Sequence, residues 1–493
     1  MNWFDVKNEG AVGDGVQLET KTLQRVIDAC VKSGGGTVYF PPGTYLTGTL
    51  NLGSNLVIHL EAGAIILASP NREADYPSIG MMCERRDTVL IYARDQKNIS
   101  VVGAGRIEGN GDAFYFMDEP VEEGDYDPAR ARQGSDFGSK PYGVEDGPVK
   151  PKPYGELKKY GEGFELRYGS LMLFVNCEQL TFRDFHLTGS ANWGLHLAGC
   201  RYATISGLTI RFSLLIPNAD CIDVANSQNI TITNCLIEGG DDGIAITPCA
   251  DGYHLSPTEN IAVTNCTILS RSCAIRVGYG IKPVKNCIFS NIIIHSSNRG
   301  IGVFIRNGQT LENVLFSDII IETRLHTGWW GAGEPIHISA IPGYTEDVSL
   351  GFIRNVRFRN ILAKSETGIV IYGADHPDTS HPIRDISFDG LKLEIVPGKL
   401  NDRFGGNIDL RPANDLAFKV FKSDLPGLYA KNVKGLTIRN FELIWPEKPA
   451  EYFNHAVQTQ NCLQVLVDSF TGEAAHPRYE PIVSEGGEKP RIK

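Results

Sequence analysis

The sequence predicts an all-β protein, built as a parallel β-solenoid with an N-terminal cap. Two observations carry this prediction: a strand-bend-strand frame of nine residues recurs along most of the chain, and the opening segment lacks it. The frame is clearest in residues 229–237, Asn-Ile-Thr-Ile-Thr-Asn-Cys-Leu-Ile, and 260–268, Asn-Ile-Ala-Val-Thr-Asn-Cys-Thr-Ile. A coil of this length cannot bury its apolar face alone, so successive coils are expected to stack.

The opening segment, residues 1–53, predicts a cap that contains one short helix. Residues 18–32 carry apolar side chains at a helical spacing, and the glycines of 34–36 end that pattern. Residues 37–40, Thr-Val-Tyr-Phe, then read as a strand that leads into a Pro-Pro-Gly turn.

The repeating frame is expected to fill residues 54–446, and residues 447–493 to close the C-terminal end of what is effectively a single domain. Apolar residues occupy the second, fourth, seventh and ninth places, and the sixth place is Asn, Asp or Gly, which tolerate left-handed backbone. Leucine-rich repeats are the rival at this period, but their consensus leucines are absent and the strands are rich in β-branched residues. The frame fits 179–187, 202–210, 229–237, 260–268, 286–294, 313–321, 355–363, 385–393 and 435–443.

Two stretches interrupt the repeat, at residues 112–169 and 324–346. The first is rich in Gly, Pro, Tyr and charge, and so long a loop is usually functional or disordered. The second contains Trp329 and Trp330. Adjacent tryptophans cannot both point into a solenoid core, so at least one is expected at a surface. There it would stack on a sugar ring or, as an equal alternative, seal the loop onto the coil.

Composition narrows the classes of partner. The net charge of −11 argues against binding to nucleic acid or to anionic membranes. The sequence contains no run of 18 apolar residues, so no membrane span is predicted. The first residues have neither a basic region nor an apolar signal core, which predicts a cytoplasmic protein. Eleven cysteines, an odd count without a Cys-x-x-Cys pair, favour reduced core thiols over a full disulfide framework or a zinc site. We expect no cofactor. The oligomeric state does not follow from the sequence.

A candidate catalytic site lies where two coils each begin with a carboxylate. Asp220 opens Asp-Cys-Ile-Asp-Val, and Asp242 opens Asp-Gly-Ile-Ala-Ile, 22 residues later. If Ile222 and Ile244 occupy equivalent places, the two carboxylates stack, and Asp241 leans to the other side. Aspartate most often caps turns, but three aspartates beside a glycine pair favour a functional site.

Three clustered carboxylates suit the cleavage of glycosidic bonds. Inverting hydrolysis needs one protonated acid and one ionised base, about 6.5–9.5 Å apart. Crowding of like charges raises the pKa of at least one of the groups, as an acid catalyst requires. The same cluster could instead hold Ca²⁺, which takes six to eight oxygen ligands.

Later coils supply side chains that could bind an acidic sugar. Arg276 is expected two coils from Asp223, and Arg306 lies one coil further on. Two arginines near aspartates form either a salt-bridge network or a clamp for a carboxylated sugar, and we favour the clamp. His196, at the strand place of Asp223, is either a sugar contact or a structural histidine. Glu334 is a further candidate polar contact.

The motifs around these aspartates resemble glycoside hydrolase family 28, the polygalacturonases and their relatives. Residues 218–220, Asn-Ala-Asp, are similar to the family's Asn-Thr-Asp motif, and residues 240–242 match its Gly-Asp-Asp motif. Residues 190–196, with Trp193 and His196, are similar to the coil before the site, and residues 10–45 to the family's cap. The resemblance implies a right-handed parallel β-helix that hydrolyses pectic chains with inversion.

The same resemblance assigns roles to individual residues. Asp241 would be the general acid, Asp220 and Asp242 would hold and deprotonate water, and Asn218 and Trp193 would help to bind the substrate. Two motifs depart from the family: residues 272–274 are Ser-Cys-Ala in place of Gly-His-Gly, and residues 304–306 are Phe-Ile-Arg in place of Arg-Ile-Lys. Arg276 is expected to compensate, and the predicted substrate is a galacturonate-containing or related oligosaccharide.

As a cytoplasmic hydrolase, the protein would trim imported oligosaccharides, and residues 112–169 could block one end of the cleft to enforce exo action.

Two other functions stay open beside an inverting hydrolase. A β-helix polysaccharide lyase would instead use a Lys or Arg base, often with Ca²⁺. A solenoid that binds glycans without turnover is the third possibility, and the retained aspartates argue against it.

Overall fold

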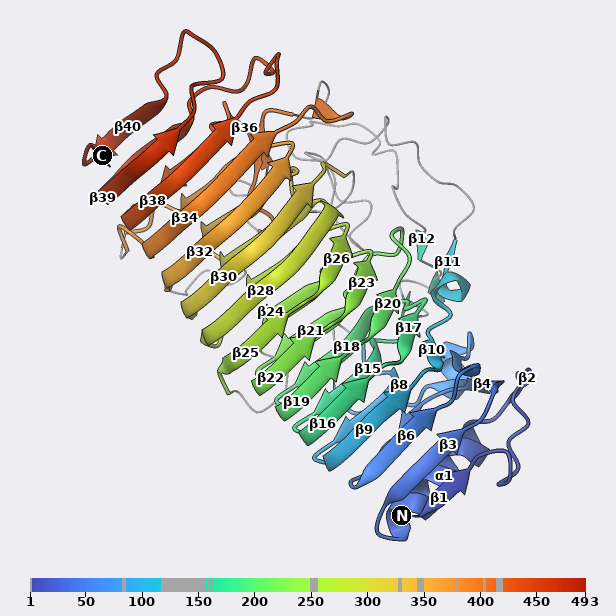
Figure 1. Ribbon diagram of the computed structural model, residues 1–493. Coiled ribbons are helices and arrows are strands. Elements are labelled where there is room, and N and C mark those ends of the chain that lie inside the picture. The colour runs from blue at the N-terminus through green and yellow to red at the C-terminus, as the bar shows by residue number, and fades with distance from the viewer. Residues whose placement is uncertain are drawn as a thin grey trace. The chain divides into compact units, whose positions relative to one another are not determined.

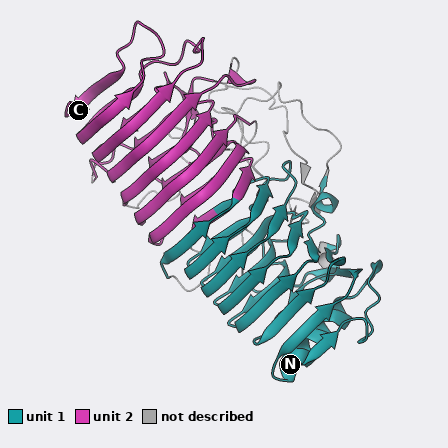
Figure 2. Ribbon diagram, viewed as in Figure 1, with its two compact units in different colours: residues 1–120, 154–244, 250–266 teal, residues 121–153, 245–249, 267–493 magenta. Residues whose placement is uncertain are grey.

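The computed structural model describes residues 2–81, 86–116, 156–157, 159–160, 164–165, 167–248, 256–326, 330–343, 350–377, 379–401, 405–413 and 420–493. The chain forms two compact units (Figure 2). Unit 1 comprises residues 1–120, 154–244 and 250–266, and unit 2 comprises residues 121–153, 245–249 and 267–493. Within the described ranges, no helix has the length and apolar character needed to cross a membrane.

Unit 1 consists of parallel strands that stack in three sets (Figure 1). The first set is β1 (Trp3–Asp5), β3 (Gly36–Phe40), β6 (Leu56–Leu60), β9 (Lys97–Gly103), β16 (Glu178–Arg183), β19 (Arg201–Ser206), β22 (Gln228–Thr233) and β25 (Thr258–Thr264). The second is β2 (Asp14–Leu18), β4 (Gly43–Thr47), β7 (Ala64–Ala68), β10 (Arg106–Glu108), β17 (His186–Thr188), β20 (Thr209–Arg211) and β23 (Leu236–Gly239). The third is β5 (Leu50–Asn51), β8 (Val89–Arg94), β15 (Ser170–Val175), β18 (Trp193–Ala198) and β21 (Ile222–Ala225).

Unit 2 continues the same construction with longer strands. One set is β26 (Thr267–Ser270), β28 (Val284–Ser297), β30 (Thr310–Thr323), β32 (Phe352–Ser365), β34 (Ile383–Ile395), β38 (Val433–Ile444), β39 (Val457–Thr471) and β41 (Arg491–Ile492). The other is β27 (Cys273–Gly278), β29 (Arg299–Ile305), β31 (Ile336–Ala340), β33 (Ile369–Gly373), β37 (Leu428–Lys431), β39 and β40 (Ile482–Gly487). β24 (Ile244–Thr247) begins in unit 1 and ends in unit 2.

Helices and hairpins are short additions to these stacks. The predicted cap helix is confirmed as α1 (Thr20–Lys32), which buries Leu23, Val26, Ile27 and Cys30 as expected. In the described part of the chain, the other helices are α2 (Arg72–Asp75) and the 3-10 helix η1 (Gly111–Phe114). Antiparallel pairs are β11 (Tyr115–Phe116) with β12 (Glu156–Leu157), β13 (Lys159–Tyr160) with β14 (Phe164–Glu165), and β35 (Asn407–Asp409) with β36 (Val420–Lys422). Most of the predicted 112–169 insertion lies outside the described residues.

The bends of the coils confirm the role predicted for the sixth place of the frame. Every sixth-place residue has a positive φ, between 50° at Asn360 and 73° at Gly390. First-place residues do too, even Gln179 at 59° and Tyr202 at 58°, so each coil has a second left-handed bend that the sequence pattern did not reveal. Amide side chains bond from coil to coil at these bends. In unit 1, for example, Asn260 Nδ2 donates to Asn229 Oδ1 at 3.1 Å.

The inward faces of the coils form the core of each unit. Cys235 and Cys266, predicted as core residues, are buried in unit 1. In unit 2, four phenylalanines stack at centroid distances of 4.8–4.9 Å, in the order Phe289, Phe316, Phe358 and Phe388. Stacking of identical residues in register keeps the coils aligned, which fixes where outward side chains recur.

Candidate active site

The three predicted catalytic aspartates meet in unit 1 and form what we call the acidic cluster. One carboxylate oxygen from each of Asp220, Asp241 and Asp242 lies within 4.8 Å of the others. All three residues are at most 3% exposed. Within the residues that the structure describes, this is the one group of acidic, histidine or cysteine side chains close enough to hold a metal ion.

Coil stacking produces this meeting in the way that the sequence predicted. In β18, the Leu195 N–H donates to the Cys221 carbonyl while Leu195 is in register with Ile222. The Ile222 N–H donates in the same manner to the Gly243 carbonyl at 3.2 Å, which aligns Ile222 with Ile244. Asp220 and Asp242, each two residues earlier, therefore occupy equivalent places on neighbouring coils.

The glycine pair before Asp241 allows the neighbouring loop to approach closely. A Cβ atom on Gly240 would lie 2.3 Å from the Ile216 carbonyl oxygen, and one on Gly239 would lie 2.5 Å from Cys221 Sγ. Any larger side chain at either position would push away the 213–221 segment, which carries Asp220. The glycines are thus a requirement of the packing that brings the acids together.

Asn218 connects this loop to the proposed acid. Its backbone is left-handed, with a φ of 55°, and its N–H donates to Asp241 Oδ2 at 3.2 Å. Asparagine tolerates this conformation better than most residues, which explains its use at this turn. Asn218 was predicted to bind substrate, and that role stays a prediction.

A buried arginine that the sequence reading missed supports the same loop. Arg167 Nη2 donates to Asn218 Oδ1 at 3.1 Å, and Arg167 Nη1 donates to the Pro217 carbonyl at 3.1 Å and the Ala191 carbonyl at 3.2 Å. The Tyr115 hydroxyl accepts from Nη1 at 2.7 Å and donates to the Ala191 carbonyl at 3.0 Å. Both residues flank a stretch without repeat pattern, so nothing in the sequence marked them.

His196 and Trp193 lie on β18, one coil before Asp220 and Asp223. The predicted equivalence of His196 and Asp223 is confirmed by their register. Burial lowers the pKa of His196 to about 3, so its imidazole is neutral at ordinary pH. The Trp193 and His196 rings meet edge-to-face with centroids 4.8 Å apart. Their proposed contacts with sugar are still predictions.

The field of the acidic cluster is negative. Burial raises the pKa of the Cys221 thiol well above its usual range, and the carboxylates of Asp220, Asp223, Asp241 and Asp242 raise it further. Such a site suits a reaction that develops positive charge on a sugar ring. It also offers hard oxygen donors of the kind that Ca²⁺ prefers.

The spacing of the carboxylates bears on stereochemistry. One oxygen from each carboxylate lies within 4.8 Å of the others, and this is compatible both with the separation of about 6.5–9.5 Å between the carboxyl groups of typical inverting enzymes and with the separation of about 5–5.5 Å in retaining ones. With three carboxylates, different pairs can serve as acid and base. The anomeric form of the product is therefore the deciding measurement.

The predicted arginines belong to unit 2, where each has partners of its own. Arg276 is buried, with Nη1 donating to the Gly278 carbonyl at 3.2 Å and its guanidinium 5.5 Å from the Tyr279 ring. Arg306 uses all of its nitrogens on protein oxygens, at Ile305, Ser339, Leu410 and Pro412. It also lies 5.0 Å from the centre of the Phe304 ring. These bonds fix the arginine side chains, and their contact with a sugar carboxylate remains a prediction.

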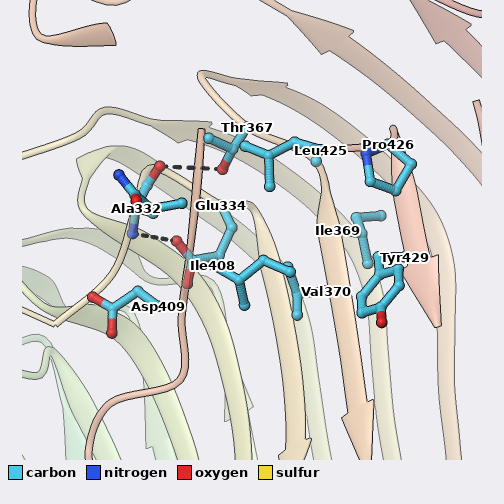
Figure 3. Close-up of a pocket in the computed structure, with 12 residues that line it drawn as sticks. Ala332, Glu334, Thr367, Ile369, Val370, Ile408, Asp409, Leu425, Pro426 and Tyr429 are labelled. Carbon is cyan, nitrogen blue, oxygen red and sulfur yellow. Dashed lines mark hydrogen bonds between the residues drawn. The ribbon is translucent and has the colours of Figure 1, made fainter. Parts of the chain in front are cut away.

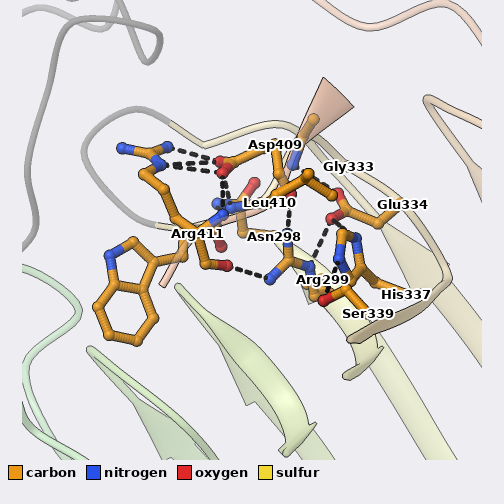
Figure 4. Close-up of polar contacts among 12 residues, drawn as sticks. Asn298, Arg299, Gly333, Glu334, His337, Ser339, Asp409, Leu410 and Arg411 are labelled. Carbon is orange, nitrogen blue, oxygen red and sulfur yellow. Dashed lines mark hydrogen bonds and ion pairs between the residues drawn. The ribbon is translucent and has the colours of Figure 1, made fainter. Parts of the chain in front are cut away.

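Glu334 belongs to a second buried group of charged side chains, which we call the paired cluster: Arg299, Glu334, His337, Asp409 and Arg411. Figure 4 shows the Arg299 guanidinium between Glu334 and the 409–411 segment. Arg299 Nε pairs with Glu334, while its Nη1 and Nη2 donate to the Arg411 carbonyl at 3.0 Å and the Asp409 carbonyl at 2.8 Å. Arg411 Nη2 pairs with Asp409 Oδ2 at 2.6 Å.

The paired cluster sets the protonation of its members. Although burial raises the pKa of Glu334, the Arg299 guanidinium and His337 lower it to about 2. Burial, together with Arg299, lowers the pKa of His337 to about 4. Glu334 and Asp409 also border a small pocket lined largely by aliphatic side chains such as Ile369 and Leu425 (Figure 3). Glu334 is thus fully engaged with protein groups, and its role as a sugar contact remains a prediction.

The other predicted residues of unit 2 are only partly described. Trp330 is half-buried, its carbonyl accepts from Asn298 Nδ2 at 3.1 Å, and its ring meets Tyr279 edge-to-face. Trp329 lies outside the described residues. Cys273, which replaces the family's histidine, is buried in β27 in register with Arg299.

Comparison with known proteins supports the resemblance seen in the motifs. Residues 167–324 match the family described as glycosyl hydrolases family 28, and residues 3–59 match that described as rhamnogalacturonase A/epimerase, pectate lyase-like. Over 257 residues the chain is 28% identical to an exo-poly-alpha-D-galacturonosidase of Dickeya chrysanthemi, covering 49% of this chain and 41% of that protein. It is 26% identical over 256 residues to a probable polygalacturonase of Vitis vinifera, covering 50% and 44%. The chain thus spans less than half the length of these relatives.

Solved structures confirm the predicted fold class, a right-handed parallel β-helix. A hyperthermoactive exopolygalacturonase from Thermotoga maritima aligns with a TM-score of 0.60 at 20% identity, covering 80% of this chain and 87% of that one. A family 28 exopolygalacturonase from Yersinia enterocolitica aligns with a TM-score of 0.62 at 16% identity, covering 100% and 78%. The predicted resemblance to family 28 is confirmed by the family match and by these relatives.

Proposed function

We propose that this chain, which carries the motifs and the fold of glycosyl hydrolases family 28, hydrolyses glycosidic bonds in galacturonate-containing oligosaccharides. The observation that carries the proposal is the acidic cluster, in which three buried carboxylates converge within 4.8 Å on neighbouring coils. Burying three carboxylates together is unfavourable in free energy, so their convergence favours a role in acid–base catalysis.

In the proposed reaction, Asp241 is the general acid. The Asn218 N–H donates to Asp241 Oδ2 at 3.2 Å, and in the proposed reaction Oδ1 carries the proton. Asp241 Oδ1 gives this proton to the glycosidic oxygen as the bond to the anomeric carbon breaks. Asp220 and Asp242 hold a water molecule, and one of them takes its proton as the water oxygen bonds to the anomeric carbon. The remaining negative charge stabilises the oxocarbenium-like transition state.

We further propose exo action on pectic oligosaccharides. Two relatives are named exo-poly-alpha-D-galacturonosidase and exopolygalacturonase, and two structural neighbours are exopolygalacturonases. A sugar carboxylate would be recognised by arginine, for which Arg276 and Arg306 are the predicted candidates. The cytoplasmic location expected from the sequence likewise stays a prediction.

The test is product analysis by proton NMR on defined oligogalacturonates and rhamnogalacturonates. The wild type is expected to release the inverted anomer from one chain end, and Asp241→Asn to lose at least about 10²-fold in kcat because the acid can no longer donate a proton. Asp184→Asn is the matched control, since Asp184 lies at an exposed bend after β16 and pairs with Arg183.

Other outcomes select the alternatives. A product that absorbs as an unsaturated uronide, with loss of activity on chelation of Ca²⁺, would establish a lyase that uses the oxygen cluster as a metal site. Tight binding of an oligosaccharide without any turnover would establish a glycan-binding solenoid. A retained anomer would leave hydrolysis in place but make one carboxylate a nucleophile.

A further inference from the structure

We propose that Arg167 is a positioning residue for the general acid, acting through Asn218. This inference rests on the proposed function, in which Asp241 is the acid. It deepens that function by naming a residue that touches neither the substrate nor the reacting atoms. The chain of contacts runs from the guanidinium to the Asn218 side chain, and from the Asn218 N–H to Asp241 Oδ2.

Arg167 makes more hydrogen bonds to the protein than a single salt bridge would provide. Its side chain is fully buried, and the hydrogen bonds described above reach two backbone carbonyls, one hydroxyl and one amide oxygen. The two carbonyls come from different coils, Ala191 before β18 and Pro217 before β21. One planar group thus fixes the spacing between the coil that precedes the site and the loop that carries the acid's partner.

The reason for such support lies in the conformation of Asn218. Its φ of 55° is uncommon for a residue with a side chain, and such residues persist only where their surroundings determine them. Arg167 Nη2 donates a hydrogen bond to the side-chain oxygen of Asn218, which restricts rotation of the Asn218 side chain. The backbone N–H of Asn218 then stays directed at Asp241 Oδ2.

Tyr115 completes the support from the other end of the insertion. Tyr115 and Arg167 are separated by 51 intervening residues, yet the Tyr115 hydroxyl accepts from Arg167 and donates to the Ala191 carbonyl. The two ends of the 112–169 insertion are therefore joined directly behind the loop of the acidic cluster. This placement gives the two ends a structural link to the site that does not depend on the rest of the insertion.

Loss of the hydrogen bonds from Arg167 is expected to change the pKa of Asp241 in a definite direction. A hydrogen bond from an N–H favours the ionised form of a carboxylate, so weakening the Asn218 bond raises the pKa of Asp241. Asp241 must be protonated to act, and activity falls at pH values above its pKa. A variant without the guanidinium should therefore lose rate while the basic limb of its pH profile moves upward.

The primary experiment compares Arg167→Met with the wild type and with Arg211→Met, an exposed arginine of β20. We expect Arg167→Met to lower kcat by about 10- to 100-fold with KM changed less than about threefold, because the acid is displaced rather than the sugar site. The basic limb should move upward by about half a pH unit or more. Arg211→Met should match the wild type in all three respects. An unchanged kcat, or a loss of kcat without a shifted limb, would overturn the proposal.

A second measurement does not need activity. Hydrogen exchange by mass spectrometry should show faster exchange in a peptide spanning 216–221 of Arg167→Met, with unchanged exchange in β22. If the wild type turns over no substrate but this loop loosens, the proposed function fails, and what stands is that Arg167 fixes the conformation of the loop that contacts Asp241. If the loop exchanges as in the wild type, the positioning role fails whatever the activity. Should Arg167→Met not fold, Tyr115→Phe removes one acceptor of the guanidinium and should give the same local effect in smaller measure.

Discussion

The acidic cluster and the paired cluster are both buried and both rich in charge, yet they are opposite in design. In the acidic cluster of unit 1, three carboxylates meet one another. In the paired cluster of unit 2, each carboxylate meets a guanidinium, Glu334 with Arg299 and Asp409 with Arg411. Like charges gathered in a low dielectric raise the free energy of the folded state, whereas opposite charges offset part of their desolvation.

The difference teaches that burial of ionisable groups does not by itself mark a catalytic site. Whether the neighbouring charges have the same or opposite sign is more informative. The sequence analysis named Glu334 as a candidate polar contact for a sugar, but its oxygens pair with Arg299 and His337. The paired cluster ties the 409–411 segment to β29 and so serves the fold. In the acidic cluster three carboxylates converge on one another, and this pattern favours a catalytic use.

The largest test of this contrast is Glu334→Gln. Removing the carboxylate charge leaves Arg299 buried without its ion pair, and breaking one partner of a buried pair costs about 3–5 kcal/mol. We expect the free energy of unfolding, measured by denaturant titration, to fall by about that amount. The matched control is Glu322→Gln, which removes a half-exposed ion pair with Arg324 at 2.8 Å and should cost about 0–1 kcal/mol. Equal effects of the two substitutions would refute the structural role of the paired cluster.

A pH series sharpens the same point. His337 has its pKa lowered to about 4 by burial and by Arg299, whereas in the unfolded chain it titrates near its ordinary value, about 6.5. Between these values the unfolded state binds more protons, so stability is complete above about pH 6.5 and is lost as the pH falls toward about 4. His196, with a pKa near 3 through burial, adds a loss of the same sign.

Each lowered pKa unit corresponds to about 1.4 kcal/mol, so His337 alone should contribute a loss of about 3 kcal/mol by pH 4. The measurement is the free energy of unfolding at intervals from pH 7.5 to pH 4. His186→Asn, which changes an exposed histidine of β17, is the control and should leave the curve unchanged. A wild-type curve that is flat over this range would mean that His337 is not held neutral in the folded protein.

Much of the fold could be predicted because each coil repeats the same local chemistry. Asn, Asp or Gly at one bend and apolar residues at fixed places recur often enough to reveal the stacking. The equivalence of Ile222 and Ile244 then followed, and with it the meeting of Asp220 and Asp242. The second bend escaped notice because Gln179 and Tyr202 occupy it in left-handed conformation without the usual residue types.

The unpredicted parts depend on contacts between distant, non-repeating segments. Arg167 follows a stretch without periodicity, and three of its four acceptors are oxygens of a carbonyl or a tyrosine, which leave no sequence signal. Arg299 likewise binds carbonyls of Asp409 and Arg411, more than 100 residues away in the chain. A sequence pattern identifies residues by type and spacing, so it does not reveal a side chain whose partners are backbone carbonyls of distant segments.

The smallest expected effect, Asp242→Asn, reverses the sign seen for Glu334. Replacing one of three clustered carboxylates by a neutral amide of the same shape removes like-charge repulsion, so we expect the free energy of unfolding at pH 7 to rise by about 1 kcal/mol while turnover falls. Asp184→Asn, at an exposed bend, should change stability by less than about 0.5 kcal/mol. A loss of stability in Asp242→Asn would contradict the expected like-charge repulsion within the acidic cluster. If Ca²⁺ then stabilised the wild type but not the variant, a bound cation would be the missing compensation, and the contrast between the two clusters would become one between two kinds of counter-charge.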